Sequence, residues 1–217
     1  WGHASLIFKH AVHEELIEVS PMASLDKELT LGVKLRPRDR VLNDLEVRAL
    51  WHACDGLPWP HGHLYRWLLL TGVRMSEATG AEWTEFHPEV RRVLREGGQA
   101  SELQPEHRLW TIPPERFKSD AAHIVPLTDQ MLELLATIPM CGRNVQAARP
   151  ARYVFSHDGA NKLWASSKIK HELDRRMLAL LREWAAERGE DPDSVTLAPW
   201  VAHDLRRVVR SNLSALG

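Results

Sequence analysis

Apolar residues recur three and four positions apart in several separate segments of the chain, the spacing that gathers side chains on one face of a helix. Residues that favour helix ends, such as Gly56 and Gly72, separate these segments. Asn43, with Glu46 three positions later, is typical of a helix start. The pattern predicts helices over residues 5–19, 43–55, 64–70, 76–81, 128–138 and 167–188, and from Ala202 to at least Leu216.

Only a few short segments have the character of strands. Residues 110–113 and 123–127 are two apolar runs on either side of a polar stretch, which predicts a β-hairpin. Residues 153–155 predict a third, brief strand. The segment 88–108 is longer and more polar than a tight connection requires, and its Gly97-Gly98 pair indicates a turn. We therefore expect a mainly α fold of the α+β class, with one small antiparallel β-sheet.

The helix predicted over residues 5–19 stands apart from the others. A single amphipathic helix cannot bury its own apolar face, so residues 1–21 are expected to be the last helix of an upstream helical domain. The sequence starts at Trp1, and we expect it to begin inside a longer chain. Residues 22–41 lack periodicity and end with four positive charges and one negative charge over 34–40, which predicts a basic linker. Residues 42–217 are expected to form the main domain.

Composition excludes several classes of protein. The 217 residues carry 28 Lys and Arg against 29 Asp and Glu, a formal charge of −1. The apolar runs are far shorter than the ~20 residues of a membrane-spanning helix, and no signal peptide is apparent. Cys54 and Cys141 have neither disulfide-framework nor zinc-ribbon spacing, so we expect a cytoplasmic protein. Because the near-neutral charge gives no overall sign of a nucleic-acid partner, any such partner must be recognised by local clusters.

The sequence predicts neither a metal site nor a cofactor. Residues 13–17 begin like a zinc-protease helix, but Ile17 stands where the second histidine is needed. Two histidine pairs, His10 with His13 and His61 with His63, lack a cysteine or carboxylate that would complete a tetrahedral set. Glycine patterns of phosphate- and dinucleotide-binding loops are also missing.

Three segments combine polar residues in a way that suggests chemistry. Arg74 follows the helix-terminating Thr71-Gly72 pair, Lys118 lies in the predicted hairpin, and His203 and Arg206 lie one helical turn apart on one face. Each has a purely structural explanation when taken alone. Arg74 could simply pair with Glu77, for example. It is the joint occurrence and the order of the three segments that favour a shared site.

Together these segments resemble the signature of the tyrosine recombinase (phage integrase) family. That family has an Arg after a Thr-Gly pair, a Lys in a β-hairpin and a His-x-x-Arg motif, in this order. The resemblance covers about 41–217, and its most specific part is the stretch His-Asp-Leu-Arg-Arg at 203–207 followed by 211–217. It implies the catalytic-domain fold of that family, with residues 1–21 as the end of a core-binding domain. It also implies double-stranded DNA as partner, a homotetramer on two DNA sites and a bacterial or phage-encoded source.

By this resemblance Arg74, Lys118, His203 and Arg206 are catalytic, and Glu77 supports the first arginine. The expected reaction is site-specific recombination or integration through a 3′-phosphotyrosyl intermediate. Two guanidiniums suit the charge that builds up on a phosphorane, because they are always charged and offer forked donors. A lysine can protonate the leaving 5′-oxygen. Further positive charges are expected to contact DNA, namely Arg36, Arg38, Arg40, Arg207 and Arg210.

The sequence departs from the family at the nucleophile. A tyrosine is expected some tens of residues after position 217, whereas Tyr65 and Tyr153 both precede His203. We therefore expect a catalytic domain without its nucleophile and inactive by itself. Val208 occupies a place where the family often has threonine. Two alternatives stay open: a non-catalytic DNA-binding protein on the recombinase fold, and an enzyme similar to type IB topoisomerases.

Overall fold

The computed structural model describes residues 2–25, 39–116, 121–140, 150–164 and 166–215. The chain divides into two compact units, residues 1–39 and 40–217, and this boundary lies inside the predicted linker. The first unit contains α1 (Gly2–His13), which starts and ends earlier than predicted. Glu15 has a φ of 55°, outside the right-handed helical region, so the helix cannot continue to residue 19.

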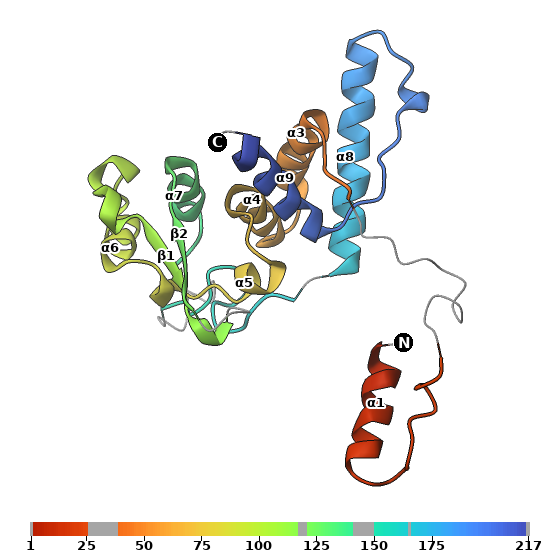
Figure 1. Ribbon diagram of the computed structural model, residues 1–217. Coiled ribbons are helices and arrows are strands. Elements are labelled where there is room, and N and C mark those ends of the chain that lie inside the picture. The colour runs from red at the N-terminus through yellow and green to blue at the C-terminus, as the bar shows by residue number, and fades with distance from the viewer. Residues whose placement is uncertain (1, 26–38, 117–120, 141–149, 165, 216–217) are drawn as a thin grey trace. The chain divides into compact units, whose positions relative to one another are not determined.

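Helices make up most of the second unit (Figure 1). They are α3 (Asp44–Ala53), α4 (His61–Thr71), α5 (Met75–Thr79), α6 (Pro88–Glu96), α7 (Asp129–Ala136), α8 (Ser167–Glu187) and α9 (Ala202–Ala215). Single 3-10 turns lie at Cys54–Gly56, Trp83–Glu85, Ala100–Glu102, Pro105–His107, Pro114–Arg116 and Pro192–Ser194. Strands β1 (Leu109–Ile112) and β2 (His123–Pro126) pair antiparallel, with Trp110 opposite Val125. The predicted mainly helical fold with a small antiparallel sheet is confirmed.

Local sequence signals account for several element boundaries. The Asn43 side chain accepts a hydrogen bond from the Glu46 N–H at 2.9 Å, and Glu46 accepts one from the Asn43 N–H at 2.9 Å. This reciprocal cap confirms the predicted start of α3. The strand predicted at 153–155 is wrong. Tyr153 makes only an isolated bridge to Glu82, and its N–H bonds Gly159 O in a turn, so no ladder forms.

The core is built around Trp67 of α4, which is fully buried. Its ring lies 5.4 Å from that of Trp110 on β1, 6.0 Å from Phe155 and 6.1 Å from Phe86, measured between centroids. Phe86 and Trp110 stack with an interplanar angle of 3°. These aromatic contacts fix the sheet to the central helix, and α4 in turn supports the residues that follow it.

Helix α9 packs directly against α4 (Figure 1). Leu205 and Val208 are buried in this contact, whereas Leu213 near the end of α9 is 62 % exposed. Gly72, at the end of α4, has a φ of +63°, and a Cβ there would lie 2.9 Å from Val209 Cγ1. The absence of a side chain at Gly72 therefore allows the two helices to approach closely.

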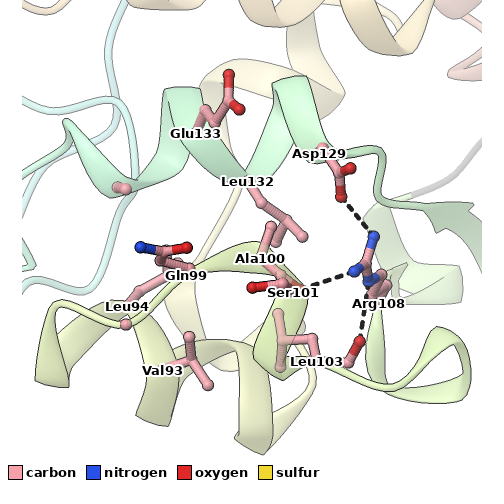
Figure 2. Close-up of a pocket in the computed structure, with 12 residues that line it drawn as sticks. Val93, Leu94, Gln99, Ala100, Ser101, Leu103, Arg108, Asp129, Leu132 and Glu133 are labelled. Carbon is pink, nitrogen blue, oxygen red and sulfur yellow. Dashed lines mark hydrogen bonds and ion pairs between the residues drawn. The ribbon is translucent and has the colours of Figure 1, made fainter.

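The segment 88–108 forms α6 and two of the 3-10 turns, and Arg108 attaches it to α7. The Arg108 guanidinium donates to the carbonyls of Ala100 (2.7 Å) and Leu103 (3.1 Å) and pairs with Asp129 (2.6 Å). Figure 2 shows these bonds at the edge of a pocket between the segment and α7. Since these contacts already occupy Nε, Nη1 and Nη2 of Arg108, we assign the segment a structural role in the domain body.

None of the helices in the described ranges is long and apolar enough to cross a lipid bilayer.

Candidate active site

The first predicted arginine lies between the end of α4 and the start of α5. The backbone N–H of Arg74 donates to Glu77 Oε2 at 2.8 Å, and Arg74 Nη1 donates to Glu77 Oε1 at 2.6 Å. The Glu77 side chain is 2 % exposed and that of Arg74 is 35 % exposed. The buried carboxylate thus holds a guanidinium that still reaches solvent, and the supporting role of Glu77 in catalysis stays a prediction.

Arg206 lies on α9, far from Arg74 in the sequence, but its side chain contacts the chain just before Arg74. Its Nη1 donates to the carbonyl of Gly72 at 2.5 Å. Burial lowers the pKa of the Arg206 guanidinium, and so do the positive charges of Arg74 and Arg210, whereas the Glu77 carboxylate acts in the opposite direction. The charges of Arg74 and Arg210 thus act on Arg206 against a single carboxylate, that of Glu77, and this excess of positive charge favours binding of an anion.

The remaining part of the His-x-x-Arg motif lies at the start of α9. His203 is exposed, one helical turn before Arg206. Asp204 is completely buried, and its Oδ2 accepts from the Val201 N–H at 2.9 Å. Its Oδ1 accepts from Arg207 Nη1 at 3.0 Å. Asp204 thus fixes the first turn of the helix that carries His203 and Arg206, and it ties down Arg207, for which we predicted contact with DNA.

The other predicted DNA-contacting residues have different surroundings. Arg40 donates to Glu46 Oε1 at 2.5 Å and to Val41 O at 2.7 Å, so it reinforces the cap of α3. Arg210 is exposed on α9. Arg36, Arg38 and Lys118 lie outside the described residues, as does Cys141. The structure thus brings Arg74, Glu77 and Arg206 together, and the catalytic and DNA-binding roles themselves stay predictions.

Tyr65 is built into the core. It is 5 % exposed, and its ring lies 6.5 Å from that of Trp200 in a T-shaped arrangement. Burial raises the pKa of the Tyr65 hydroxyl to about 12, with a smaller contribution from the negative charge of Asp174. A phenol that is buried and holds its proton is poorly suited to attack a phosphate. Tyr153 is half-buried, with the Arg152 guanidinium 5.0 Å above its ring.

No group of three or more metal-binding side chains occurs among the described residues. Two pairs of histidine rings lie close together, His87 with His107 at 4.6 Å and His61 with His157 at 5.6 Å between centroids. Burial lowers the pKa of His61, and the neighbouring His157 lowers it further.

Arg116 contacts the main chain of the site, although no sequence pattern singled it out. Its Nη2 donates to the Glu77 carbonyl at 2.5 Å, and its Nη1 pairs with Glu85. The only signal in the sequence was its place two positions before Lys118.

Comparison with known proteins agrees with this geometry. The family model described as "Phage integrase family" matches residues 40–217. The chain belongs to the phage integrase family. No curated protein sequence gave a significant match.

The solved structures that resemble this family member are integrases of a transposon. One is residues 82–397 of the Tn1549 transposon integrase, as a single-substitution variant, in complex with a circular intermediate DNA. It has a TM-score of 0.50 and 12 % identity over 97 % of the present chain and 63 % of its own. A second variant, in complex with transposon right-end DNA, has a TM-score of 0.45 and 14 % identity over the same shares. The chain thus spans less than two thirds of these integrase chains, and the first likeness shows a shared fold.

Proposed function

We propose that the chain contains the catalytic domain of a site-specific DNA recombinase, which cleaves and rejoins duplex DNA through a 3′-phosphotyrosyl intermediate. The observation that carries this proposal is the meeting of Arg74 and Arg206 around the buried Glu77 carboxylate. Membership of the phage integrase family supports it, and the Tn1549 integrase of similar fold forms complexes with DNA.

In this proposal the two arginines bind the phosphate at the cleavage point. A guanidinium offers paired N–H donors that match two phosphate oxygens, and it keeps its charge throughout the reaction. Glu77 holds Arg74 in place, and the Gly72 carbonyl holds Arg206, so little reorganisation is needed as negative charge develops. This arrangement lowers the energy of the phosphorane relative to the ground-state phosphodiester.

Proton transfer is assigned to Lys118 and His203. A tyrosine oxygen attacks phosphorus, the bond to the 5′-oxygen breaks, and Lys118 gives that oxygen a proton. His203 hydrogen-bonds the phosphate or accepts the proton of the attacking hydroxyl. The phosphotyrosyl bond conserves the energy of the broken phosphodiester, so rejoining requires no cofactor.

We further propose that neither Tyr65 nor Tyr153 is the nucleophile. The burial of Tyr65 and its raised pKa argue against it, and Tyr153 is half-buried, with its ring covered by the Arg152 guanidinium. The attacking tyrosine then belongs to residues that this sequence does not contain. Arg36, Arg38, Arg40, Arg207 and Arg210 are proposed to contact the DNA backbone, with a homotetramer assembling on two sites.

The test measures binding of this chain to a duplex oligonucleotide by fluorescence anisotropy over a range of salt concentrations. Arg74→Ala and Arg206→Ala should each weaken binding and reduce the slope of log K against log salt by about 1, the loss of one phosphate contact. Arg92→Ala is a matched control, because Arg92 pairs with Glu89 and Glu96 on the exposed face of α6. It should leave the slope unchanged.

The cleavage step is tested with a nicked duplex and denaturing electrophoresis. This chain should give no covalent adduct, whereas the natural full-length protein should give one that disappears in Arg74→Ala and Arg206→Ala. An adduct on the present chain would identify Tyr65 or Tyr153 as nucleophile. DNA binding without any adduct from the full-length protein would favour the non-catalytic alternative.

A further inference from the structure

Arg116 joins β1 to α5 through one guanidinium. It follows β1 in the 3-10 turn Pro114–Arg116, and its side chain is 22 % exposed. Nη1 pairs with the buried carboxylate of Glu85, whose other oxygen accepts from Trp110 Nε1 at 2.9 Å. Nη2 donates to the main-chain carbonyl of Glu77 at 2.5 Å. The bonds thus run from the buried core strand to the residue that holds Arg74.

The Glu77 carbonyl needs such a donor because of where it lies in α5. This helix has five residues, so the carbonyls of its last turn have few partners within the helix. The N–H of Ala81, which would continue the ladder to Glu77, bonds Ala78 O instead. Arg116 supplies the missing donor.

Gly80 leaves the space that this contact requires. A Cβ at Gly80 would lie 2.9 Å from Arg116 Nη2 and 3.2 Å from Ser76 O. The φ of Gly80 is −95°, which other residues adopt without strain, so the close approach of Arg116 is what favours glycine here.

We propose that Arg116 is a positioning residue for Arg74 and acts through Glu77. The inference rests on the proposed function, in which Arg74 binds the scissile phosphate. A helix of one turn is not stable by itself, so its ends must be held by other elements. The Glu77 side chain fixes Arg74 at one end, and Arg116 fixes the main chain of Glu77 from the other. Without Arg116, the carboxylate that aims Arg74 is less firmly placed.

The test titrates the 217-residue chain with inorganic phosphate and follows the Arg74 Nε–Hε resonance by NMR. That resonance is assigned from its loss in Arg74→Ala. Arg116→Gln should shift the Arg74 resonance before phosphate is added and raise the dissociation constant for phosphate by about threefold to tenfold. The same substitution is then made in Arg74→Ala, where phosphate binding is followed through the Arg206 resonance. There Arg116→Gln should change the dissociation constant for phosphate by less than about 1.5-fold, because Arg74, the side chain that it positions, is gone.

Two further variants separate positioning from folding. Glu85→Gln keeps an acceptor for Trp110 Nε1 but removes the charge that holds Arg116. It should therefore weaken phosphate binding, as Arg116→Gln does, but by a smaller factor. If Arg116→Gln does not fold, Glu85→Gln tests the proposal in its place. Arg92→Gln removes an arginine with two carboxylate partners on the exposed face of α6 and should leave the constant unchanged.

The outcomes distinguish the two proposals. If Arg74→Ala leaves phosphate binding unchanged, Arg74 is not an anion ligand, and the proposed function and the role of Arg116 are both wrong. If Arg74→Ala weakens binding but the effect of Arg116→Gln is absent or fully additive to it, only the role of Arg116 is wrong.

Discussion

Position 72 has two structural requirements, and only glycine meets both. Gly72 ends α4 with a φ of +63°, and a Cβ there would lie only 2.9 Å from Val209 Cγ1 of α9. We expect Gly72→Ala to lower the free energy of unfolding by about 2–4 kcal/mol, the sum of left-handed backbone strain and a steric clash. Urea unfolding followed by tryptophan fluorescence measures the difference.

Gly97 provides the matched control for this prediction. It also has a positive φ, +71°, but a Cβ there would meet nothing within 4 Å. Gly97→Ala should therefore cost only the backbone strain, about 1–2 kcal/mol. Equal losses for the two variants would mean that the contact between Gly72 and Val209 contributes nothing.

Tyr65 should make stability depend on pH in the alkaline range. Its pKa is about 12 in the folded chain against 10.0 for an unburied tyrosine, so the unfolded chain loses the proton first. The stabilisation is complete below pH 10 and is lost as the pH rises to 12, by about 2–3 kcal/mol. Tyr65→Phe should flatten this part of the curve of unfolding free energy against pH.

Cys54 contributes to the same pH range and needs its own control. Burial raises the pKa of its thiol from 9.0 to about 12, so part of the alkaline loss should remain in Tyr65→Phe. Cys54→Ala identifies that part. An unchanged curve in Tyr65→Phe would show that the hydroxyl is not desolvated in the folded chain.

At the scale of single residues, the sequence predicted those pairs of side chains that lie close together along the chain. Arg74 with Glu77 and His203 with Arg206 are three residues apart, so helical geometry alone relates them. The contact of Arg206 with Gly72 spans 134 positions, and no local pattern anticipates it. The order of the motifs and the resemblance to a family placed Arg206 in the same site as Arg74. Arg116 could not be found at all, because its partners Glu85 and Glu77 are 31 and 39 positions away.

Capping strength should differ between α3 and α7. Asn43 accepts from the Glu46 N–H at 2.9 Å, whereas Thr128 Oγ1 accepts from the Met131 N–H at 3.4 Å, a long hydrogen bond. We expect Asn43→Ala to cost about 1 kcal/mol and Thr128→Ala less than that. Thermal and urea unfolding of the two variants give the comparison. A larger loss in Thr128→Ala would contradict the geometry.

At the scale of elements, strong local signals were reliable and weak ones were not. The cap at Asn43 and the apolar periodicity of 167–188 placed α3 and α8 almost correctly, since both signals are local. The run at 153–155 is buried and apolar, but strand formation also needs a partner strand, which a local pattern does not report. No local pattern assigns a role to the segment 88–108, because its attachment through Arg108 depends on Asp129, across the hairpin.

At the scale of the whole molecule, net charge and local charge point in different directions. The chain carries −1 overall, yet Arg206 is under the influence of two further positive charges, those of Arg74 and Arg210, and of one carboxylate, that of Glu77. Many of the other arginines are paired with carboxylates, such as Arg92 with Glu96 and Arg175 with Glu172. A global balance near zero is therefore compatible with a local anion site, which is why composition alone could not predict the partner.

This local excess of charge predicts that anions stabilise the fold. Inorganic phosphate binding between Arg74 and Arg206 should raise the melting temperature by about 3–6 °C at ten times its dissociation constant, because only the folded chain holds both arginines together. Sodium chloride at equal ionic strength controls for screening, which relieves the same repulsion without specific binding. Arg206→Met should remove the phosphate effect and also raise the melting temperature in chloride, since a half-buried guanidinium beside like charges is replaced by an apolar side chain. Equal phosphate effects in Arg206→Met and the unaltered chain would place the anion elsewhere on the molecule, and the pairing of Arg74 with Arg206 would then be a feature of the fold alone.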